Sequence, residues 1–242
     1  MIATDAKRKL GIAVAKDFAA VMQGKVAIAG EASYEAARQV FNGAEDRRPK
    51  LFTFCESARD VQEAVRAARA HGLPLSVRGG GHDWAGRALS DHGLVVDLSR
   101  MRQVEVDVRG RVATVAGGAL AGDVVAAAGP RALAAVTGAA GTVGFAGLLT
   151  GGGYGPLLPR FGLALDNLLG AEIVLADGQM VFADSSQNSE LFWAIRGGGG
   201  NFGVVTSMLV RLHPIEKVLA GFILFPLDEA MSVLTGCAVR KS

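Results

Sequence analysis

Apolar residues recur along the chain with two different periods, so the pattern predicts both helices and strands. The clearest helical period runs from Ser57 to His71, where Ser57 can cap the first turn and Gly72 and Pro74 end the helix. Three further helices are predicted at residues 10–18, 34–41 and 123–128.

Runs of apolar and β-branched residues predict strands, several of them joined by turn dipeptides. Arg109-Gly110 separates two alternating runs and Asp177-Gly178 separates two more, so each pair is predicted as a hairpin. The predicted strands cover residues 75–78, 94–98, 104–108, 111–116, 171–176, 179–182 and 204–212. Because hairpins recur among the helices, an α+β fold is favoured over a doubly wound parallel sheet.

A second region is predicted after His213-Pro214. Residues 218–226 have the composition of one strand, and residues 227–234 have the pattern of a helix start. No further element is predicted before Ser242. We therefore expect two domains, one over residues 1–214 and a second, at residues 215–242, of which only the beginning is present.

Glycine is the compositional feature that changes this picture, because it supplies 33 of the 242 residues, about twice its usual share. With 7 prolines and 50% hydrophobic residues, neither a disordered nor a collagen-like chain fits. The two cysteines, Cys55 and Cys237, are too few and too distant in sequence to indicate a disulfide framework or a metal centre, and idle thiols are expected.

Charge and hydropathy exclude two classes of partner. The net charge is +2, both signs are interspersed and 6% of the residues are aromatic, so nucleic-acid binding is not expected. No run reaches the ~18 apolar residues that a membrane span needs. The apolar run at residues 10–15 is too short for the core of a signal peptide, so a cytoplasmic protein is expected.

The glycines gather in three clusters, and each cluster is expected beside a predicted strand. The clusters are Gly79–Gly81, Gly151–Gly153 with Gly155, and Gly197–Gly200 with Gly203; a looser run covers residues 138–147. Successive glycines let backbone N–H groups converge on an anion without Cβ clashes, and a pyrophosphate suits such a concavity. Tight turns and close packing remain the alternative for each cluster taken alone.

Neither common nucleotide motif accounts for the clusters. The Walker spacing is absent, and Trp84 and Pro156 stand where a Gly-x-Gly-x-x-Gly loop would need its third glycine. His82 follows the first cluster directly, and a histidine there can donate a hydrogen bond, act as a base or become a nucleophile, while a structural role stays open. The other histidines are expected to be structural or exposed.

Six motifs then point to one family by their order and spacing. They are Phe41-Asn42-Gly43-Ala44, Ser76-Val77-Arg78-Gly79-Gly80-Gly81-His82, Gly141-Thr142-Val143-Gly144, Gly151-Gly152-Gly153-Tyr154-Gly155, Asp166-Asn167-Leu168-Leu169 and the run from Leu191 to Thr206. Over about residues 34–214 the chain resembles the FAD-binding domain of the vanillyl-alcohol oxidase/PCMH superfamily, and within it the berberine-bridge-enzyme-like oxidases. The resemblance implies a PCMH-type fold of two α/β subdomains with mixed sheets.

The resemblance also implies which residues hold FAD. The implied contacts are Arg78, Gly79, Gly80, Gly81, His82, Asp83 and Gly86 around the pyrophosphate, Thr142, Val143, Gly144 and Gly147 at the isoalloxazine and ribityl part, Gly152 and Gly153 at the phosphates, and the backbone of Val204 and Val205 at the adenine. His82 would be bonded covalently to the flavin 8α-methyl carbon. Many members carry a cysteine where this chain has Ala140, so a single covalent link is expected.

The implied activity is that of a flavoprotein oxidase, which moves a hydride from a small organic substrate to FAD with O₂ as acceptor. Two alternatives stay open: a truncated FAD-binding domain without turnover, and an FAD subunit that needs a partner chain. The catalytic base is expected in the absent C-terminal part. Asp83, Asp97 and Asp166 are candidates by chemistry alone, and solvated or structural roles are favoured for them.

Overall fold

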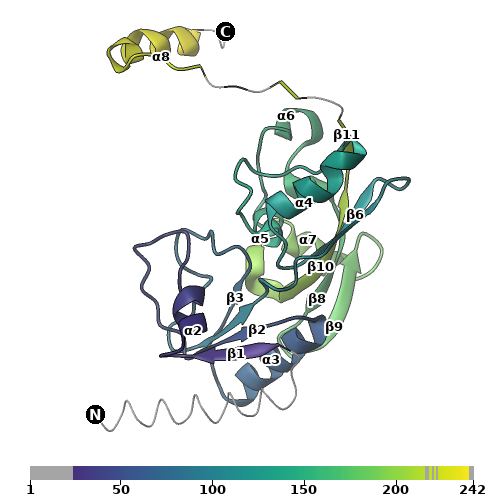
Figure 1. Ribbon diagram of the computed structural model, residues 1–242. Helices are drawn as coiled ribbons and strands as arrows, with labels where there is room; N and C mark the ends of the chain where they lie inside the picture. The colour runs from purple at the N-terminus through teal and green to yellow at the C-terminus, as the bar shows by residue number, and fades with distance from the viewer. Residues whose placement is uncertain (1–23, 216–217, 220, 222, 240–242) are drawn as a thin grey trace.

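Two β-sheets organise the chain in the computed structural model, which describes residues 24–215, 218–219, 221 and 223–239 (Figure 1). The first sheet has the strand order β1-β2-β4-β3 and the second has the order β5-β6-β10-β8-β9. The strands are β1 (Lys25–Ile28), β2 (Leu51–Phe54), β3 (Leu75–Arg78), β4 (Leu94–Asp97), β5 (Val104–Asp107), β6 (Val112–Ala116), β8 (Leu168–Val174), β9 (Met180–Asp184) and β10 (Val204–Arg211), with a short separate pair, β7 (Leu133–Ala134) and β11 (His213–Pro214).

The two sheets differ in strand direction. In the first sheet β2, β4 and β3 run parallel, while β1 is antiparallel to β2. The pairings β5–β6, β6–β10, β10–β8 and β8–β9 of the second sheet are all antiparallel. The predicted α+β class is confirmed. The expectation of mixed sheets is right for the first sheet and wrong for the second, because hairpins and the return of β10 set each of its strands against an antiparallel neighbour.

Helices and 3₁₀ turns connect and follow these strands. They are α2 (Ala32–Ala37), α3 (Ala58–Ala70), α4 (Ala121–Ala128), α5 (Phe145–Thr150), α6 (Leu158–Phe161), α7 (Ser189–Ile195) and α8 (Ala230–Val239), with η1 (Gly129–Arg131), η2 (Ala164–Asn167), η3 (Gly199–Phe202) and η4 (Leu227–Glu229). The helix predicted over residues 57–71 is confirmed as α3. Its capping box is formed by Ser57, whose hydroxyl accepts from the Asp60 N–H at 3.2 Å, and by the Asp60 carboxylate, which accepts from the Ser57 N–H at 3.2 Å.

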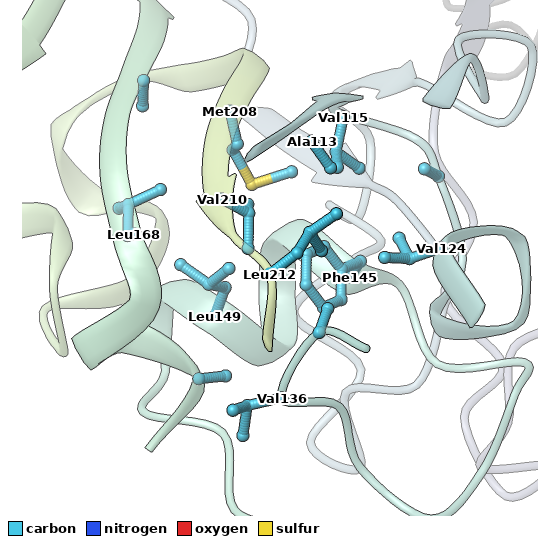
Figure 2. Close-up of a cluster of buried hydrophobic side chains, with 14 of the residues drawn as sticks. Ala113, Val115, Val124, Val136, Phe145, Leu149, Leu168, Met208, Val210 and Leu212 are labelled. Carbon is cyan, nitrogen blue, oxygen red and sulfur yellow. The ribbon is translucent and has the colours of Figure 1, made fainter. Parts of the chain in front are cut away.

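Buried side chains form three groups, one of which joins the two sheets. The largest packs the second sheet against helices that include α4, α5 and α7, with Phe145 and Met208 near its centre (Figure 2). Another lies between α3 and the first sheet and includes Val174 of β8 and Val204 of β10. The third covers the opposite face of the first sheet around Phe52. Because α3 contacts strands of both sheets, the buried group around this helix fixes the position of one sheet relative to the other.

The predicted hairpins are confirmed, and aspartates stabilise both turns. In the β5–β6 turn Asp107 Oδ1 accepts from the N–H groups of Arg109 and Gly110 at 3.0 Å. In the β8–β9 turn Asp177 Oδ1 accepts from the Gln179 N–H at 2.8 Å. Because these bonds join residues close together in sequence, local pattern was enough to indicate the hairpins.

Several predicted elements differ from the observed ones. The helix predicted over residues 34–41 is α2, and Phe41 lies in a loop because its N–H donates to the Gly81 carbonyl. The helix predicted from Asp123 is α4, which begins at Ala121 because the Asp123 carboxylate accepts from the Leu120 N–H and closes an earlier turn. The strand predicted over residues 204–212 is β10, and His213-Pro214, expected to end it, forms the short strand β11.

The C-terminal region is predicted in part. None of the described residues between 218 and 226 is in a strand, so that prediction is wrong there, because no described strand lies alongside to pair with them. The helix predicted over residues 227–234 is present as η4 and α8, and α8 stands apart from the sheets in Figure 1. The predicted helix at residues 10–18 lies outside the described residues. Of the helices described, none has the length and apolar character to cross a membrane.

Phe145 offers a test of the larger core, because its ring is fully buried there (Figure 2). We expect Phe145→Ala to lower the free energy of unfolding by about 3–5 kcal/mol, since it removes apolar contacts and leaves a cavity. Val125→Ala, at a half-exposed position of α4, is the control and should change it by no more than about 0.5 kcal/mol. Urea unfolding midpoints at constant m measure both, and equal losses would contradict this placement of Phe145.

His213 is held in β11 by two contacts. Its Nε2 lies 2.6 Å from Asn167 Oδ1, and its ring stacks on Phe161 with 3.9 Å between ring centroids. Burial, together with the charges of Arg211 and Arg160, lowers the pKa of His213 below its usual value of 6.5. The imidazole is therefore kept neutral in the folded chain at a pH where the unfolded chain would protonate it.

This lowered pKa predicts a loss of stability in mild acid. As the pH falls below the usual histidine pKa, the unfolded state binds a proton that the folded state binds only at lower pH, so the free energy of unfolding decreases. We expect His213→Gln to flatten the dependence of that free energy on pH between about 5 and 7. His92→Asn, at an exposed turn position whose positive φ suits asparagine, is the control. Urea titrations at stepped pH would contradict the assignment if the two variants gave the same slope.

Candidate functional site

A glycine loop leaves the first sheet at the carboxyl end of β3. Gly79, Gly80 and Gly81 follow Arg78 directly, and Gly81 has a φ of +69°, a value that favours glycine. His82 comes next and is half-buried. The loop therefore places a histidine at the edge of the first sheet on a backbone free of side chains.

Gly80 and Gly144 bring two distant segments into direct backbone contact. A Cβ atom on Gly80 would overlap the backbone N of Gly144 and lie 2.9 Å from the Thr142 carbonyl oxygen. A Cβ atom on Gly144 would overlap the backbone N of Gly80 and lie 3.2 Å from its Cα. The first glycine cluster and the Thr142–Gly144 segment, which the sequence assigns to one site, are thus adjacent in the fold.

The Thr142–Gly144 segment is held on its other side by a short antiparallel ladder. The Ala121 N–H donates to the Val143 carbonyl at 2.9 Å, and the Phe145 N–H donates to the Ala119 carbonyl at 2.9 Å. Phe145 then begins α5 inside the core. The segment is therefore fixed both by backbone hydrogen bonds and by a buried aromatic ring.

Gly117 joins this site to the start of β10, a contact that sequence reasoning missed. The position of a Cβ on Gly79 lies 3.9 Å from the Gly117 carbonyl oxygen, and a Cβ on Gly117 would overlap the Val205 carbonyl oxygen. The Gly117 N–H also donates to the Thr206 carbonyl at 2.8 Å. The available signal was the pair Gly117-Gly118 directly after a predicted strand.

The second and third glycine clusters meet at the other end of α5. The carbonyls of Gly152 and Gly153, which have φ values of +112° and +74°, accept from the N–H groups of Leu165 and Ala164 at 3.0 and 2.7 Å. The Gly197 N–H donates to the Thr150 carbonyl at 2.9 Å. Gly151–Gly153 follow a helix, so the expectation that every cluster adjoins a strand is wrong for this one. The helix was hidden because glycine dominates its surroundings.

Gly147 differs from these tightly packed glycines. It lies within α5, is exposed, and has no atom of the described chain within 4 Å of its Cβ position. Packing inside the chain therefore gives no reason for glycine at this position.

His82 is oriented by an aromatic side chain. Its imidazole stacks on the Phe41 ring with 4.6 Å between ring centroids and 19° between the ring planes. Within the part of the chain that the structure describes, neither ring nitrogen of His82 has a hydrogen bond. The nitrogen atoms are thus unengaged while one face of the ring is covered.

The Arg78 guanidinium places a largely buried positive charge where the glycine loop begins. Its Nη1 donates to Asp97 Oδ2 at 2.8 Å, and Asp97, which is fully buried, also accepts from the Ser99 N–H at 2.8 Å. The Arg78 Nε is buried without a hydrogen-bond partner among the described residues. A buried donor of this kind is uncommon and indicates a place where a further acceptor is accommodated.

Asp83 and Gly86 shape the turn that follows His82. Asp83 Oδ2 accepts from the Arg87 N–H at 2.6 Å, and a Cβ on Gly86 would overlap the Glu45 carboxylate. Asp166 accepts from the Leu163 N–H at 2.9 Å, and Asp97 is paired with Arg78. Asp83, Asp97 and Asp166 thus each accept hydrogen bonds within the fold, which agrees with the structural roles favoured for them.

A cleft of about 310 Å³ lies between the two sheets beside β3. Leu75 and Val77 of β3, the end of α3 and the segment Gly200–Val204 line it, and most of these groups are apolar. Val204, which the family resemblance assigns to the cofactor site, is part of its wall. A flat apolar group can enter such a cleft and meet backbone polar atoms at one edge.

Metal ligands and reactive thiols are not found at this site. In the described ranges no group of three or more histidine, cysteine, aspartate or glutamate side chains is placed to hold a metal ion. Burial raises the pKa of the Cys55 thiol to about 12, so it stays protonated and unreactive. The side chain of Cys237 lies outside the described part.

Comparison with known proteins agrees with this geometry. Residues 49–184, more than half of the chain, match a family described as FAD binding domain. The (R)-6-hydroxynicotine oxidase of Paenarthrobacter nicotinovorans is 44% identical over 203 residues, which cover 84% of this chain and 44% of that protein. The chain spans less than half the length of the curated relatives it matches.

Solved structures give the same result. The structure of 6-hydroxy-D-nicotine oxidase from Arthrobacter nicotinovorans matches with a TM-score of 0.86 and 42% identity, over 90% of this chain and 49% of that one. Glucooligosaccharide oxidase from Acremonium strictum, whose FAD is a 6-S-cysteinyl, 8α-N1-histidyl flavin, matches with a TM-score of 0.78 and 33% identity, over 82% and 42%. A BBE-like protein of Physcomitrella patens also matches, at 33% identity. The chain therefore belongs to the FAD binding domain family, and the proteins that it resembles include FAD-linked oxidases and a BBE-like protein.

Proposed function

We propose that this chain is the FAD-binding part of an FAD-dependent oxidoreductase that oxidises a small organic substrate, with O₂ as electron acceptor. The observation that carries the proposal is the backbone contact between Gly80 and Gly144 beside His82, in a chain of the FAD binding domain family. The oxidase names of its relatives support the reaction class. The substrate class and the acceptor belong to the proposal.

The residues present fit FAD in three respects. Gly79–Gly81 and Thr142–Gly144 bring two stretches of backbone into contact without intervening side chains, so a ligand can approach their polar groups closely. Arg78 brings a positive charge and an unpaired N–H to the start of the glycine loop, and a pyrophosphate oxygen is a suitable acceptor for such a donor. The apolar cleft beside β3 has room for a flat ring.

We assign the parts of FAD to these features as the sequence suggested. Gly79, Gly80, Gly81 and Asp83, with Arg78 and Gly86, would hold the pyrophosphate, and Gly152 and Gly153 would approach it from the end of α5. Thr142, Val143, Gly144 and Gly147 would lie along the flavin and ribityl part. Val204 lines the cleft and Val205 contacts Gly117, which supports placing the adenine there.

Bound FAD would supply the redox chemistry, namely transfer of a hydride from the substrate and of two electrons to O₂. The chain's own contribution is to bind and orient the cofactor. No catalytic base is assigned, because the candidate carboxylates Asp83, Asp97 and Asp166 are engaged in structural hydrogen bonds. A base from outside residues 1–214, in the domain proposed to begin at residue 215, is therefore part of the proposal, as is a cytoplasmic location.

His82 is proposed to carry FAD covalently through the flavin 8α-methyl carbon. Overall, one C–H bond of the methyl group and one N–H bond of the imidazole break, a C–N bond forms, and the two electrons and two protons released reduce O₂ to H₂O₂. The unengaged ring nitrogens of His82 support this role. Ala140 has no nucleophile to match the cysteinyl link of glucooligosaccharide oxidase, so one link is proposed here.

Substitutions at Gly80 and Gly147 distinguish an effect on folding stability from an effect on FAD binding. We expect Gly80→Ala to lower the free energy of unfolding of the FAD-free chain by about 1–3 kcal/mol, because the new methyl group overlaps the Gly144 backbone. Gly147→Ala should raise it by about 0.5–1 kcal/mol, because alanine suits a helix better. If Gly147 approaches FAD, the same variant should weaken FAD binding about tenfold, the equivalent of a steric overlap of about 1.4 kcal/mol. Urea unfolding and FAD titration measure the two effects. Unchanged FAD affinity in Gly147→Ala would remove Gly147 from the site.

The covalent link is tested by denaturing the purified 242-residue chain and measuring its intact mass. We expect one FAD to stay attached to the wild-type chain and all FAD to be released from His82→Ala, which can still bind FAD without a bond. His71→Ala, an exposed histidine outside the site, is the control and should retain its FAD. Retention by His82→Ala would place the link elsewhere, and release by the wild type would contradict it. Formation of H₂O₂ with candidate substrates would exclude a domain without turnover.

A further inference from the structure

We propose that Phe41 is the positioning residue of the histidine that attaches FAD, holding the His82 imidazole by face-to-face contact in place of a hydrogen bond. The inference rests on the proposed covalent link. It concerns Phe41, whose side chain has no role in the core and is 70% exposed.

The backbone around Phe41 is tied to both sides of His82. The Phe41 N–H donates to the Gly81 carbonyl at 2.9 Å, directly before His82. Asn42 Nδ2 donates to the Trp84 carbonyl at 2.8 Å, just beyond it, and Asn42 Oδ1 accepts from the Ala44 N–H at 3.1 Å. These bonds fix the segment that carries the Phe41 ring relative to the loop that carries the imidazole.

The ring contact then fixes the imidazole itself. The two rings are close to parallel, 19° apart, with their centroids 4.6 Å from each other, which is a stacked arrangement. Histidines that react or bind metals are usually oriented by a hydrogen bond to the second ring nitrogen. Because no described group gives His82 such a bond, we take the stacked Phe41 face as the contact that orients the ring.

Stacking suits a histidine that must form a bond through nitrogen. The lone pair of a neutral imidazole lies in the ring plane, so a neighbour on the face leaves both nitrogens accessible at the edge. A carboxylate or carbonyl partner would instead occupy one nitrogen and select a tautomer. Phe41 thus restricts the orientation of the nucleophile without using either of its reactive positions.

The exposure of Phe41 is consistent with this role. α2 ends at Ala37, and Phe41 lies in the loop beyond it rather than among the buried residues around Tyr34 and Phe52. Burial of apolar surface therefore explains little of the choice of an aromatic residue here. A flat ring is required by the contact with His82, whereas an aliphatic side chain of similar size would fill the volume without fixing an angle.

The test compares Phe41→Leu and Phe41→Tyr in the full chain, with Trp193→Leu as control for loss of an equally exposed aromatic ring. FAD-free protein is mixed with FAD and quenched in acid at intervals, and the attached fraction is read by intact mass. We expect Phe41→Leu to slow attachment about tenfold or more, and Phe41→Tyr and Trp193→Leu to stay within about threefold of wild type. Reversible FAD affinity, measured in a His82→Ala background, should be the same with Phe41 and with Leu at that position.

A second measurement follows the ring contact without flavin. The imidazole proton signals of His82, identified by their loss in His82→Ala, should be shifted by the Phe41 ring current in the NMR spectra of the wild type and Phe41→Tyr, and should lose that shift in Phe41→Leu. Attachment by Phe41→Leu at the wild-type rate would overturn the role of Phe41 alone. Release of all FAD by the denatured wild type would overturn the covalent link and, with it, this role.

Discussion

The contact between the backbones of Gly80 and Gly144 is the constraint on which the site depends. Gly80 lies in the loop that follows β3 of the first sheet. Gly144 directly precedes α5, which packs in the core against the second sheet. No other residue type fits at either position, because a Cβ atom would overlap the opposite backbone. α3 holds the two sheets together through side chains. The Gly80–Gly144 contact adds a main-chain contact between the loop after β3 and the start of α5. The cofactor is proposed to bind beside this contact.

The sequence predicts well those features that short stretches of chain determine. The capping box of Ser57 and Asp60 and the turn at Asp177-Gly178 are stabilised by bonds within a few residues, so local pattern is enough. The contact between Gly117 and Val205 joins residues 88 positions apart, and no short sequence pattern predicts it. The helix α5 was missed for a different reason, because the glycines around it mask its helical pattern, while burial of Phe145 and Leu149 holds it in the core.

The pair of Arg78 and Asp97 shows how the site restricts the first sheet. The two residues are opposite each other at the ends of the parallel strands β3 and β4, and their charges are paired in the interior. A buried pair of this kind adds little net stability compared with apolar residues, but removal of one partner leaves an uncompensated charge. It therefore disfavours any other register of β3, and so it specifies where the glycine loop begins.

α5 acts as a spacer of fixed length between the glycine contacts at its two ends. Its six residues set the rise between Gly144 and Gly151 at about 10.5 Å, and insertion of one residue would rotate the second contact by about 100° relative to the first. Surface turns such as Arg109-Gly110 are under no such restriction. Among related chains, insertions and deletions are therefore expected in the hairpin turns and not in α5. An alignment that is ungapped over this helix but varies in length at the turns would reflect this restriction.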